Sequence, residues 1–189
     1  KAGAKVHRLN MTNRGCRISS LSSNTLNKII AIADSDQKNV MLYDTVAREI
    51  FFSRGALFVE GTEDANILRS YIEQRGGSEL EIFGYGSGGH GNIATWLRMC
   101  TELGIRGFGL YDGDADSSAS QASAAVTFAK DPKIEVEKLP TPDIRDKWDG
   151  AGTTLREEGA YDKDWKIKPK YNDVVDGILA SVRKHLSDI

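Results

Sequence analysis

Short apolar runs alternate with amphipathic segments from residue 56 to residue 139. Each apolar run is β-branched or aromatic in part and predicts a strand; the four runs are 56–60 (ALFVE), 80–86 (LEIFGYG), 107–112 (GFGLYD) and 133–139 (KIEVEKL). In the segments between them, apolar residues recur at spacings of three and four, which predicts helices over 62–76, 92–104 and 117–130. Residues at these spacings include Ala65, Leu68 and Ile72 in the first helix, and Ile93, Leu97, Cys100 and Leu103 in the second. Strands and helices alternating at this length pair in parallel through right-handed crossovers. We therefore expect an α/β fold, a mostly parallel sheet flanked by helices.

The two ends of the chain do not continue the alternation of strands and helices seen in residues 56–139. Residues 5–21 predict one or two strands around an Asn-Arg-Gly turn, and 22–36 and 44–55 predict helices, the second ending at Gly55. This segment is too small to bury a core alone, so we place a boundary between 1–54 and 55–189. Residues 139–165 show no period and predict a long loop. The chain closes with an amphipathic helix whose predicted apolar side comprises Val174, Val175, Ile178, Leu179 and Val182.

Composition excludes several classes of protein. The 189 residues suffice for one medium domain, and no run is long enough for a membrane helix or patterned as a signal peptide. Cys16 and Cys100 are far apart, without the spacing of a zinc site or a disulfide framework, so we expect a reducing, cytoplasmic setting and no membrane partner. The chain begins at Lys1, and we expect it to be a fragment of a longer polypeptide.

The net charge of −2 conceals an asymmetry. Residues 1–54 hold nine Lys and Arg against four Asp and Glu, whereas the remainder holds 16 against 23. A basic segment beside an acidic one is typical of a phosphate-binding surface next to a cation-binding centre. A solvated basic face at a domain edge explains the charge equally well.

Carboxylates gather where the predicted strands end. Glu60 ends the first strand and Asp64 lies one turn into the next helix, while Asp112 and Asp114 follow the third strand, with Asp116 close behind. Ligands of open α/β sheets collect at the carboxyl ends of the strands. Four or five carboxylates converging there suit Mg²⁺ or Mn²⁺, hard cations that bind oxygen and leave room for phosphate. We therefore predict a site for one or two divalent ions.

Two other interpretations use the same region. The run GYGSGG, with Gly84, Gly86 and Gly89, matches the dinucleotide-binding GxGxxG and has Asp112 downstream, which would indicate an oxidoreductase domain. Several carboxylates would repel a pyrophosphate there. The run DGDAD also resembles the DxD of haloacid-dehalogenase-like phosphatases, although it does not follow the first strand of its domain. A non-catalytic metal-binding interaction domain is a further alternative.

A glutamate in VEG at one strand end, with a DxD at the third, resembles the Toprim domain of topoisomerases, primases and some nucleases. The run AREIFFSRGALFVEGTED is similar to the junction between the ATPase and the C-terminal Toprim domain of the overcoming-lysogenization-defect (OLD) family nucleases. The resemblance covers about residues 48–116 and extends more weakly to the basic N-terminal segment. It identifies 55–189 as a Toprim catalytic domain and 1–54 as the C-terminal remnant of an ATPase domain or a linker.

This resemblance implies a metal-dependent DNA endonuclease that cleaves phosphodiesters by a two-metal mechanism. Glu60 and Asp64 would hold one ion, Asp112 and Asp114 the other, with Asp116 as an additional ligand. A lysine of KIKPK would support the charged phosphate; we choose Lys168, before the proline, with Lys166 and Lys170 as the alternatives. The implied cofactor is Mg²⁺ or Mn²⁺, with Ca²⁺ as an inert substitute. The implied partners are DNA, the ATPase domain of the same chain, a second copy and a helicase-like protein, and the implied setting is phage defence.

Overall fold

The computed structural model describes residues 5–13, 15–34, 50–75, 82–83, 89–141, 143–144, 147–148, 155–157, 159–162 and 166–187. Its strands are β1 (His7–Thr12), β2 (Gly15–Ser20), β3 (Gly55–Phe58), β4 (Ile82–Phe83), β5 (Arg106–Tyr111), β6 (Ile134–Lys138), β7 (Lys147–Trp148) and β8 (Leu155–Arg156). Its α-helices are α1 (Ser23–Asp34), α4 (Thr62–Gln74), α5 (His90–Leu103), α6 (Ala115–Phe128) and α7 (Asn172–Ser187), and a 3₁₀ turn, η2 (Pro169–Tyr171), precedes α7. No helix in these ranges is long and apolar enough to cross a membrane.

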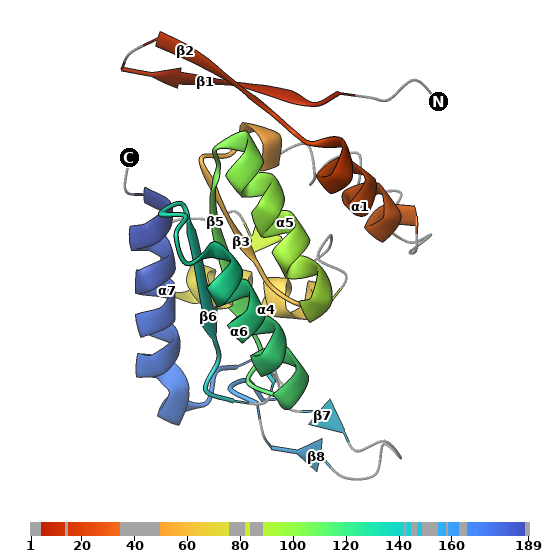
Figure 1. The fold of residues 1–189 in the computed structure, drawn as a ribbon. Coiled ribbons are helices and arrows are strands. Elements are labelled where there is room, and N and C mark those ends of the chain that lie inside the picture. The colour runs from red at the N-terminus through yellow and green to blue at the C-terminus, as the bar shows by residue number, and fades with distance from the viewer. Residues whose placement is uncertain are drawn as a thin grey trace.

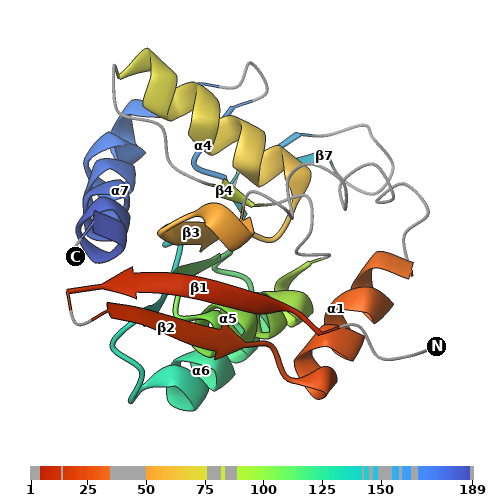
Figure 2. The same ribbon diagram turned by 90° about the horizontal axis from the view of Figure 1, so that it is seen from above.

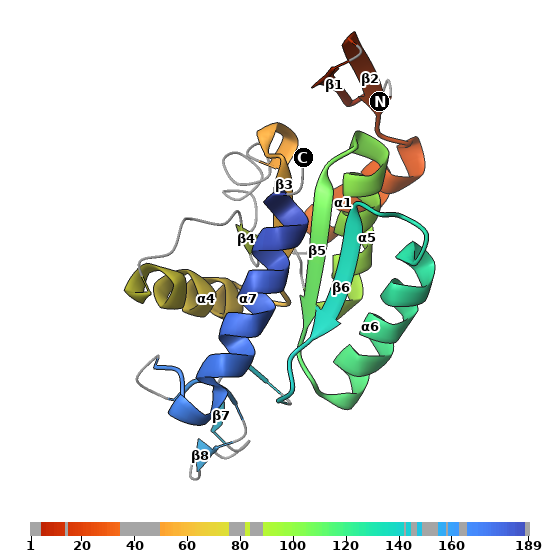
Figure 3. The ribbon, with the colours of Figure 1, turned by 90° about the vertical axis from the view of Figure 1, so that its left-hand side faces the viewer.

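The central sheet has the order β4-β3-β5-β6 and all three pairings are parallel. Helices α4 and α7 lie on one face and α1, α5 and α6 on the other (Figures 1 and 3). The core accordingly divides into two clusters, one on each side of the sheet. The predicted parallel α/β fold is confirmed, and it brings the carboxyl ends of β3, β5 and β6 to one edge.

Side chains of β3 alternate between the two clusters, as the period of a strand requires. Leu57 and Val59 pack on the side of α4 and α7, while Ala56 and Phe58 pack on the side of α5. The apolar positions predicted for α4 and α5 are all buried: Ala65, Leu68, Ile72, Ile93, Leu97, Cys100 and Leu103. In β5, a Cβ added at Gly109 would meet Leu97 at 3.0 Å, so glycine there lets α5 approach the sheet closely.

The basic N-terminal segment packs over the other end of the sheet, where the strands begin (Figures 1 and 2). The hairpin β1-β2 donates hydrogen bonds from Arg8 to Ser53 O (2.7 Å) and from Asn10 to Leu103 O (3.1 Å). The opposite face of the hairpin is apolar, and its side chains Leu9, Met11 and Ile18 are 68%, 81% and 65% exposed to solvent. Leu21 and Ile29 belong to the α5 core cluster. Of the helix predicted over 44–55, only residues from 50 onward are described, and 50–52 are helical.

The C-terminal helix α7 forms as predicted, but its buried stripe is narrower. Val175, Leu179 and Val182 are buried, whereas Val174 is 40% exposed. The assignment of Val174 to the apolar face was wrong because one helical position rotates a side chain by about 100°, which turns it away from the stripe that begins at Val175.

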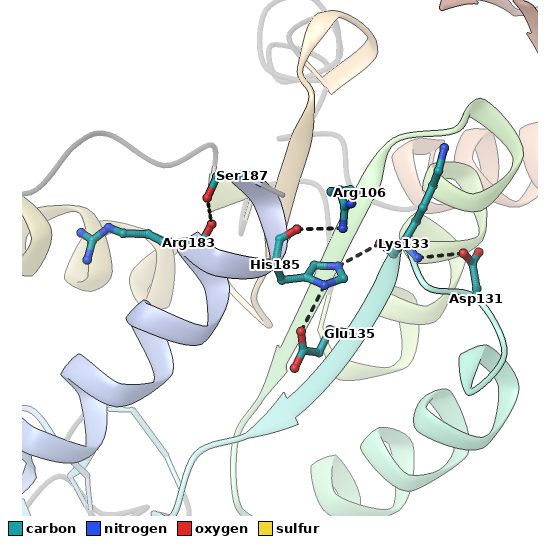
Figure 4. A network of polar contacts seen from close by, with 7 residues as sticks. All are labelled: Arg106, Asp131, Lys133, Glu135, Arg183, His185 and Ser187. Atoms are coloured by element: carbon teal, nitrogen blue, oxygen red, sulfur yellow. Dashed lines mark hydrogen bonds and ion pairs between the residues drawn. The ribbon is translucent and has the colours of Figure 1, made fainter. Parts of the chain in front are cut away.

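His185, near the end of α7, contacts residues of the sheet (Figure 4). His185 Nδ1 lies 3.1 Å from Glu135 Oε2, and its Nε2 lies 2.9 Å from Lys133 O. Arg106 donates to His185 O at 3.1 Å, and the imidazole meets the Phe108 ring edge-on. These contacts join β5, β6 and α7 near the start of the strands.

Beyond their carboxyl ends, β5 and β6 stay in contact through the backbone. Leu139 N–H donates to Tyr111 O at 2.8 Å, and Gly113 N–H donates to Thr141 O at 2.8 Å. The backbones approach so closely that a Cβ on Gly113 would lie 2.4 Å from Thr141 O and 2.6 Å from Leu139 O. Glycine at this position therefore allows the chain after β6 to cross the end of β5.

We predict that Gly113→Ala destabilises the fold by about 1–3 kcal/mol, because the added methyl overlaps backbone oxygens that cannot rotate away. Gly177→Ala in α7 is the matched control. No atom lies within 4 Å of its Cβ position, so it should be neutral or stabilising by up to about 1 kcal/mol. Urea unfolding followed by circular dichroism measures both. Equal stability of the two variants would contradict the contact.

A carboxylate of α5 holds the start of α1. Glu102 accepts hydrogen bonds from Thr25 Oγ1 (2.6 Å), Ser22 N–H (2.7 Å) and Ser22 Oγ (2.9 Å). Partial burial acts to raise the pKa of Glu102, but these hydrogen bonds and the charge of Arg98 outweigh it and leave the pKa below its ordinary value. Glu102 therefore stabilises the fold in its ionised form.

The stabilisation from Glu102 should be present above its unfolded-state pKa of about 4.3 and disappear as the pH falls through its lower folded-state pKa. Wild type should exceed Glu102→Gln in midpoint denaturant concentration at neutral pH, and the gap should close in acid. Glu73→Gln, at an exposed position of α4, serves as the control. A gap that is the same at every pH would argue against this role.

Candidate metal centre

Glu60 and Asp112 meet where β3 and β5 end. The two strands are neighbours in register, with Phe58 paired to Gly109, so the residues just beyond them share one edge of the sheet. Asp112 N–H donates to Glu60 Oε1 at 2.9 Å. The structure thus brings these two predicted residues into direct contact.

The turn between β3 and α4 directs Asp64 back toward the same edge. Gly61 is the N-cap of α4, and its N–H donates to Asp64 Oδ2 at 2.7 Å in a capping box. The carboxylate therefore caps its helix and remains close to the strand end. The Asp64 side chain can both cap α4 and lie near the end of β3, because a residue at N3 of a helix faces the N-cap that precedes it.

Asp143 completes a group of carboxylates with Asp64 and Asp112. One carboxylate oxygen from each lies within 4.8 Å of the others, and Asp112 and Asp143 are each only 8% exposed. Asp143 reaches this position because the chain after β6 is held by Gly113, and Thr141 Oγ1 donates to Asp143 O at 2.7 Å. Sequence reasoning missed Asp143, which lies in the segment without periodicity; its only signal was an acid soon after the strand beside β5.

The electrostatics of this group favour a bound cation. At an effective dielectric constant of about 20, two ionised carboxylates at this separation repel by about 3 kcal/mol. A divalent ion offsets that repulsion, and a set of carboxylate oxygens is the donor type that Mg²⁺ and Mn²⁺ prefer. Burial, and then the charge of Glu60, raise the pKa of Tyr111, whose buried hydroxyl has no hydrogen-bond partner among the described residues. Tyr111 therefore stays neutral beside the acids.

Ser117 links the two predicted halves of the site, and sequence reasoning also missed it. This fully buried residue of α6 donates its hydroxyl to Glu60 Oε1 at 2.5 Å and its N–H to Asp114 Oδ1 at 2.7 Å. Asp114 is the N-cap of α6, which explains why the helix starts there. Glu60 is therefore held by donors from both β5 and α6.

Among the described residues, the group of three carboxylates within 4.8 Å does not include Asp114 or Asp116. Asp114 and Asp116 occupy the exposed start of α6. Lys168 donates its ammonium to Gly159 O at 2.9 Å and its N–H to Ala160 O at 2.8 Å.

Of the GxGxxG glycines, Gly84 and Gly86 lie outside the described residues. Gly89 is described: it has φ +93°, forms the N-cap of α5 and donates its N–H to Glu60 O at 3.0 Å. This glycine is therefore hydrogen-bonded to the residue that ends the first strand of the site, Glu60.

Comparison with known families agrees with this geometry. Residues 51–114, which run from just before β3 to the start of α6, match the TOPRIM domain of overcoming-lysogenization-defect-protein-like proteins. No curated protein and no solved structure matches the chain significantly. Toprim domains bind divalent metals and process nucleic acids, as in nucleases and primases. The matched segment, which contains Glu60, Asp64, Asp112 and Asp114, is therefore similar to the OLD-like Toprim domain.

Proposed function

We propose that this chain is a Mg²⁺- or Mn²⁺-dependent DNA endonuclease domain that cleaves phosphodiester bonds. The observation that supports it most directly is the convergence of Asp64, Asp112 and Asp143 within 4.8 Å, with Glu60 bonded to Asp112, in an OLD-like Toprim segment. These acids come from three separate places in the sequence and meet only through the fold.

Four carboxylates would hold the metal: Glu60, Asp64, Asp112 and Asp143. A bound divalent ion would supply Lewis-acid polarisation of the phosphate and a lower pKa for an attacking water. The protein's own contribution is to fix the acids. Ser117 and the Asp112 N–H orient Glu60 Oε1, and the α4 N-terminus orients Asp64. Such prior orientation favours catalysis because the site need not reorganise during the reaction.

We also propose that the Lys168 ammonium supports the charged phosphate. Two backbone bonds favour this assignment: Lys168 N–H donates to Ala160 O, and Tyr161 N–H donates to Ile144 O, next to Asp143. The strand-like segment that carries Lys168 is thereby attached to the segment that carries Asp143. Lysine suits the role because its ammonium is a compact charge with three donors.

The finer details remain predictions from the resemblance. They comprise a second metal ion, Asp114 and Asp116 as its ligands, the ATPase domain in the same chain, a second copy, a helicase-like partner, a cytoplasmic location and a role in phage defence. Ser117 donates hydrogen bonds to both Asp114 and Glu60, so it links these two acids. That proximity favours Asp114 over Asp116 as the next ligand.

Plasmid cleavage with Mn²⁺ or Mg²⁺, and with EDTA, tests the proposal. We expect cleavage only with metal, and a loss of roughly 100-fold or more in rate for Asp112→Asn and Asp143→Asn, since even residues behind the ligands typically contribute 10–100-fold. Asp173→Asn, at an exposed position in the first turn of α7, should cleave like wild type. Circular dichroism checks that each variant folds.

Metal-independent cleavage would contradict the proposed metal dependence, and undiminished cleavage by Asp112→Asn would contradict the assignment of the active site to these carboxylates. Manganese binding without any cleavage would favour a non-catalytic metal-binding domain. A rise in melting temperature with NADH but not with Mn²⁺ would favour the dinucleotide-binding alternative. Thermal shifts with the two ligands therefore identify the dinucleotide-binding alternative, and the cleavage assay separates the two metal-binding interpretations.

Ser117→Ala tests how Glu60 is positioned. Loss of the hydroxyl removes one of the two donors to Glu60 Oε1, so we expect Mn²⁺ affinity to fall by roughly 10–100-fold, the typical effect of a residue that orients a ligand. Ser123→Ala, on the exposed side of the same helix, is the control. Calorimetric titration measures both, and equal affinities would show that Ser117 only packs the core.

A further inference from the structure

A second polar site lies at the edge of the sheet opposite the carboxylates. A cleft of about 830 Å³ opens between the hairpin β1-β2 and the beginnings of β3, β5 and β6. Five cationic side chains line it, Arg8, Arg17, Arg54, Arg106 and Lys133, against two acids, Glu102 and Asp131. We call it the basic cleft. Its cations come from five different points of the chain, so the fold, and not a local run, creates the charge.

The two acids of the cleft are hydrogen-bonded to groups other than its cationic side chains. Glu102 is engaged by Ser22 and Thr25. Asp131 accepts from Thr101 Oγ1 at 2.7 Å and from Lys133 N–H at 3.0 Å. Both carboxylates are therefore occupied by neutral donors, and no ion pair joins either of them to a cleft cation in the ranges that the structure describes.

The cations retain donors for a ligand. Lys133 donates its ammonium to one backbone carbonyl, Gly104 O. Arg106 likewise donates to one, His185 O (Figure 4). Arg17 and Arg54 are exposed and make no side-chain hydrogen bond or ion pair with another described residue. Since a guanidinium carries five N–H groups, most of the donors in the cleft remain unused.

The hairpin contributes two arginines, Arg8 and Arg17, to the lining of the cleft, and Leu9 and Met11 of the same hairpin also line it. Arg8 pairs in register with Ser19, and Asn10 with Arg17, so both arginines share the inner face. Burial lowers the pKa of Arg8, and its Nη1 atom is buried without a partner among the described residues. Arg8 Nη2 donates to Ser53 O, but no carboxylate among the described residues forms an ion pair with this partly buried guanidinium. It should therefore attract an anion more strongly than a guanidinium in bulk water.

We propose that the basic cleft binds the phosphate backbone of nucleic acid at a point remote from the metal centre. The proposal rests on the proposed function in one respect, that the ligand is the nucleic acid which the carboxylate edge would cut. Asp112 lies six residues beyond Arg106 along β5, which corresponds to about 20 Å at 3.3 Å per residue. That distance equals about six base pairs of duplex at 3.4 Å each. A duplex of ordinary length can therefore reach both edges of the sheet.

Free phosphate or a nucleotide offers the same chemistry, and length distinguishes the sources. A small anion satisfies only the cations nearest to it, whereas a continuous backbone engages cations spread over several strands. The binding of a labelled duplex of roughly 20 base pairs, longer than that six-base-pair span, is measured with the full chain in EDTA at several salt concentrations. Inorganic phosphate and ATP serve as competitors. No metal and no cleavage are needed.

The test variant is Arg17→Gln/Arg54→Gln, because neither side chain supports the described fold. The control is Lys28→Gln/Lys130→Gln, which removes the same charge at exposed positions outside the cleft. Each lost phosphate contact lowers the slope of log K against log salt by about 0.9, so the test variant should lose about 2 and the control close to none.

Equal slopes for the test and control variants would overturn the proposal, since the charge would then act only globally. ATP or phosphate is added at concentrations too low to change binding through ionic strength, as matched NaCl additions establish. Displacement of the duplex under these conditions would overturn the assignment to nucleic acid. The nuclease proposal fails independently, through plasmid cleavage. A reduced slope in a protein that cleaves nothing would leave the basic cleft intact and remove only the proposed chemistry.

Discussion

The hydrogen bond from Gly113 N–H to Thr141 O, and the close backbone approach around it, govern the geometry of the carboxylate edge. This contact extends the pairing of β5 and β6 past their last regular residues and turns the following chain across the end of β5. Asp112 precedes the contact and Asp143 follows it, so both acids reach the same place. A side chain larger than hydrogen at 113 would force the two segments apart, and the acid group depends on their proximity.

A group of acids held this close opposes folding unless something compensates for the repulsion. Backbone N–H groups and a hydroxyl supply part of that compensation, through Gly61 to Asp64 and through Asp112 and Ser117 to Glu60. These donors fix the carboxylates without neutralising them. A divalent cation is the natural remaining compensation, and its binding would stabilise the folded state, because the unfolded chain has no such arrangement.

The sheet separates charge along its strands. Acids occupy the edge where β3, β5 and β6 end, and the five cations of the basic cleft occupy the edge where they begin. The strands that separate the two edges are buried and apolar, so neither charge cancels the other at short range. A polyanion that meets a metal centre at one edge and arginines at the other would gain attraction at both, which is how a long substrate is held in a fixed register.

The sequence by itself determined the parallel α/β fold and the meeting of Glu60 with Asp112. Period and element length specify strands, helices and their crossovers locally, and parallel pairing then places all carboxyl ends at one edge. The tertiary structure alone decided the membership of Asp143 and Ser117. Asp143 lies in a segment without periodicity, and its position comes from a close approach at Gly113 that no local pattern encodes. The role of Ser117 depends on where α6 packs, and the burial of Val175 instead of Val174 depends on the rotation of α7 against the sheet. Residues far apart in the chain set those contacts, so only the folded arrangement reveals them.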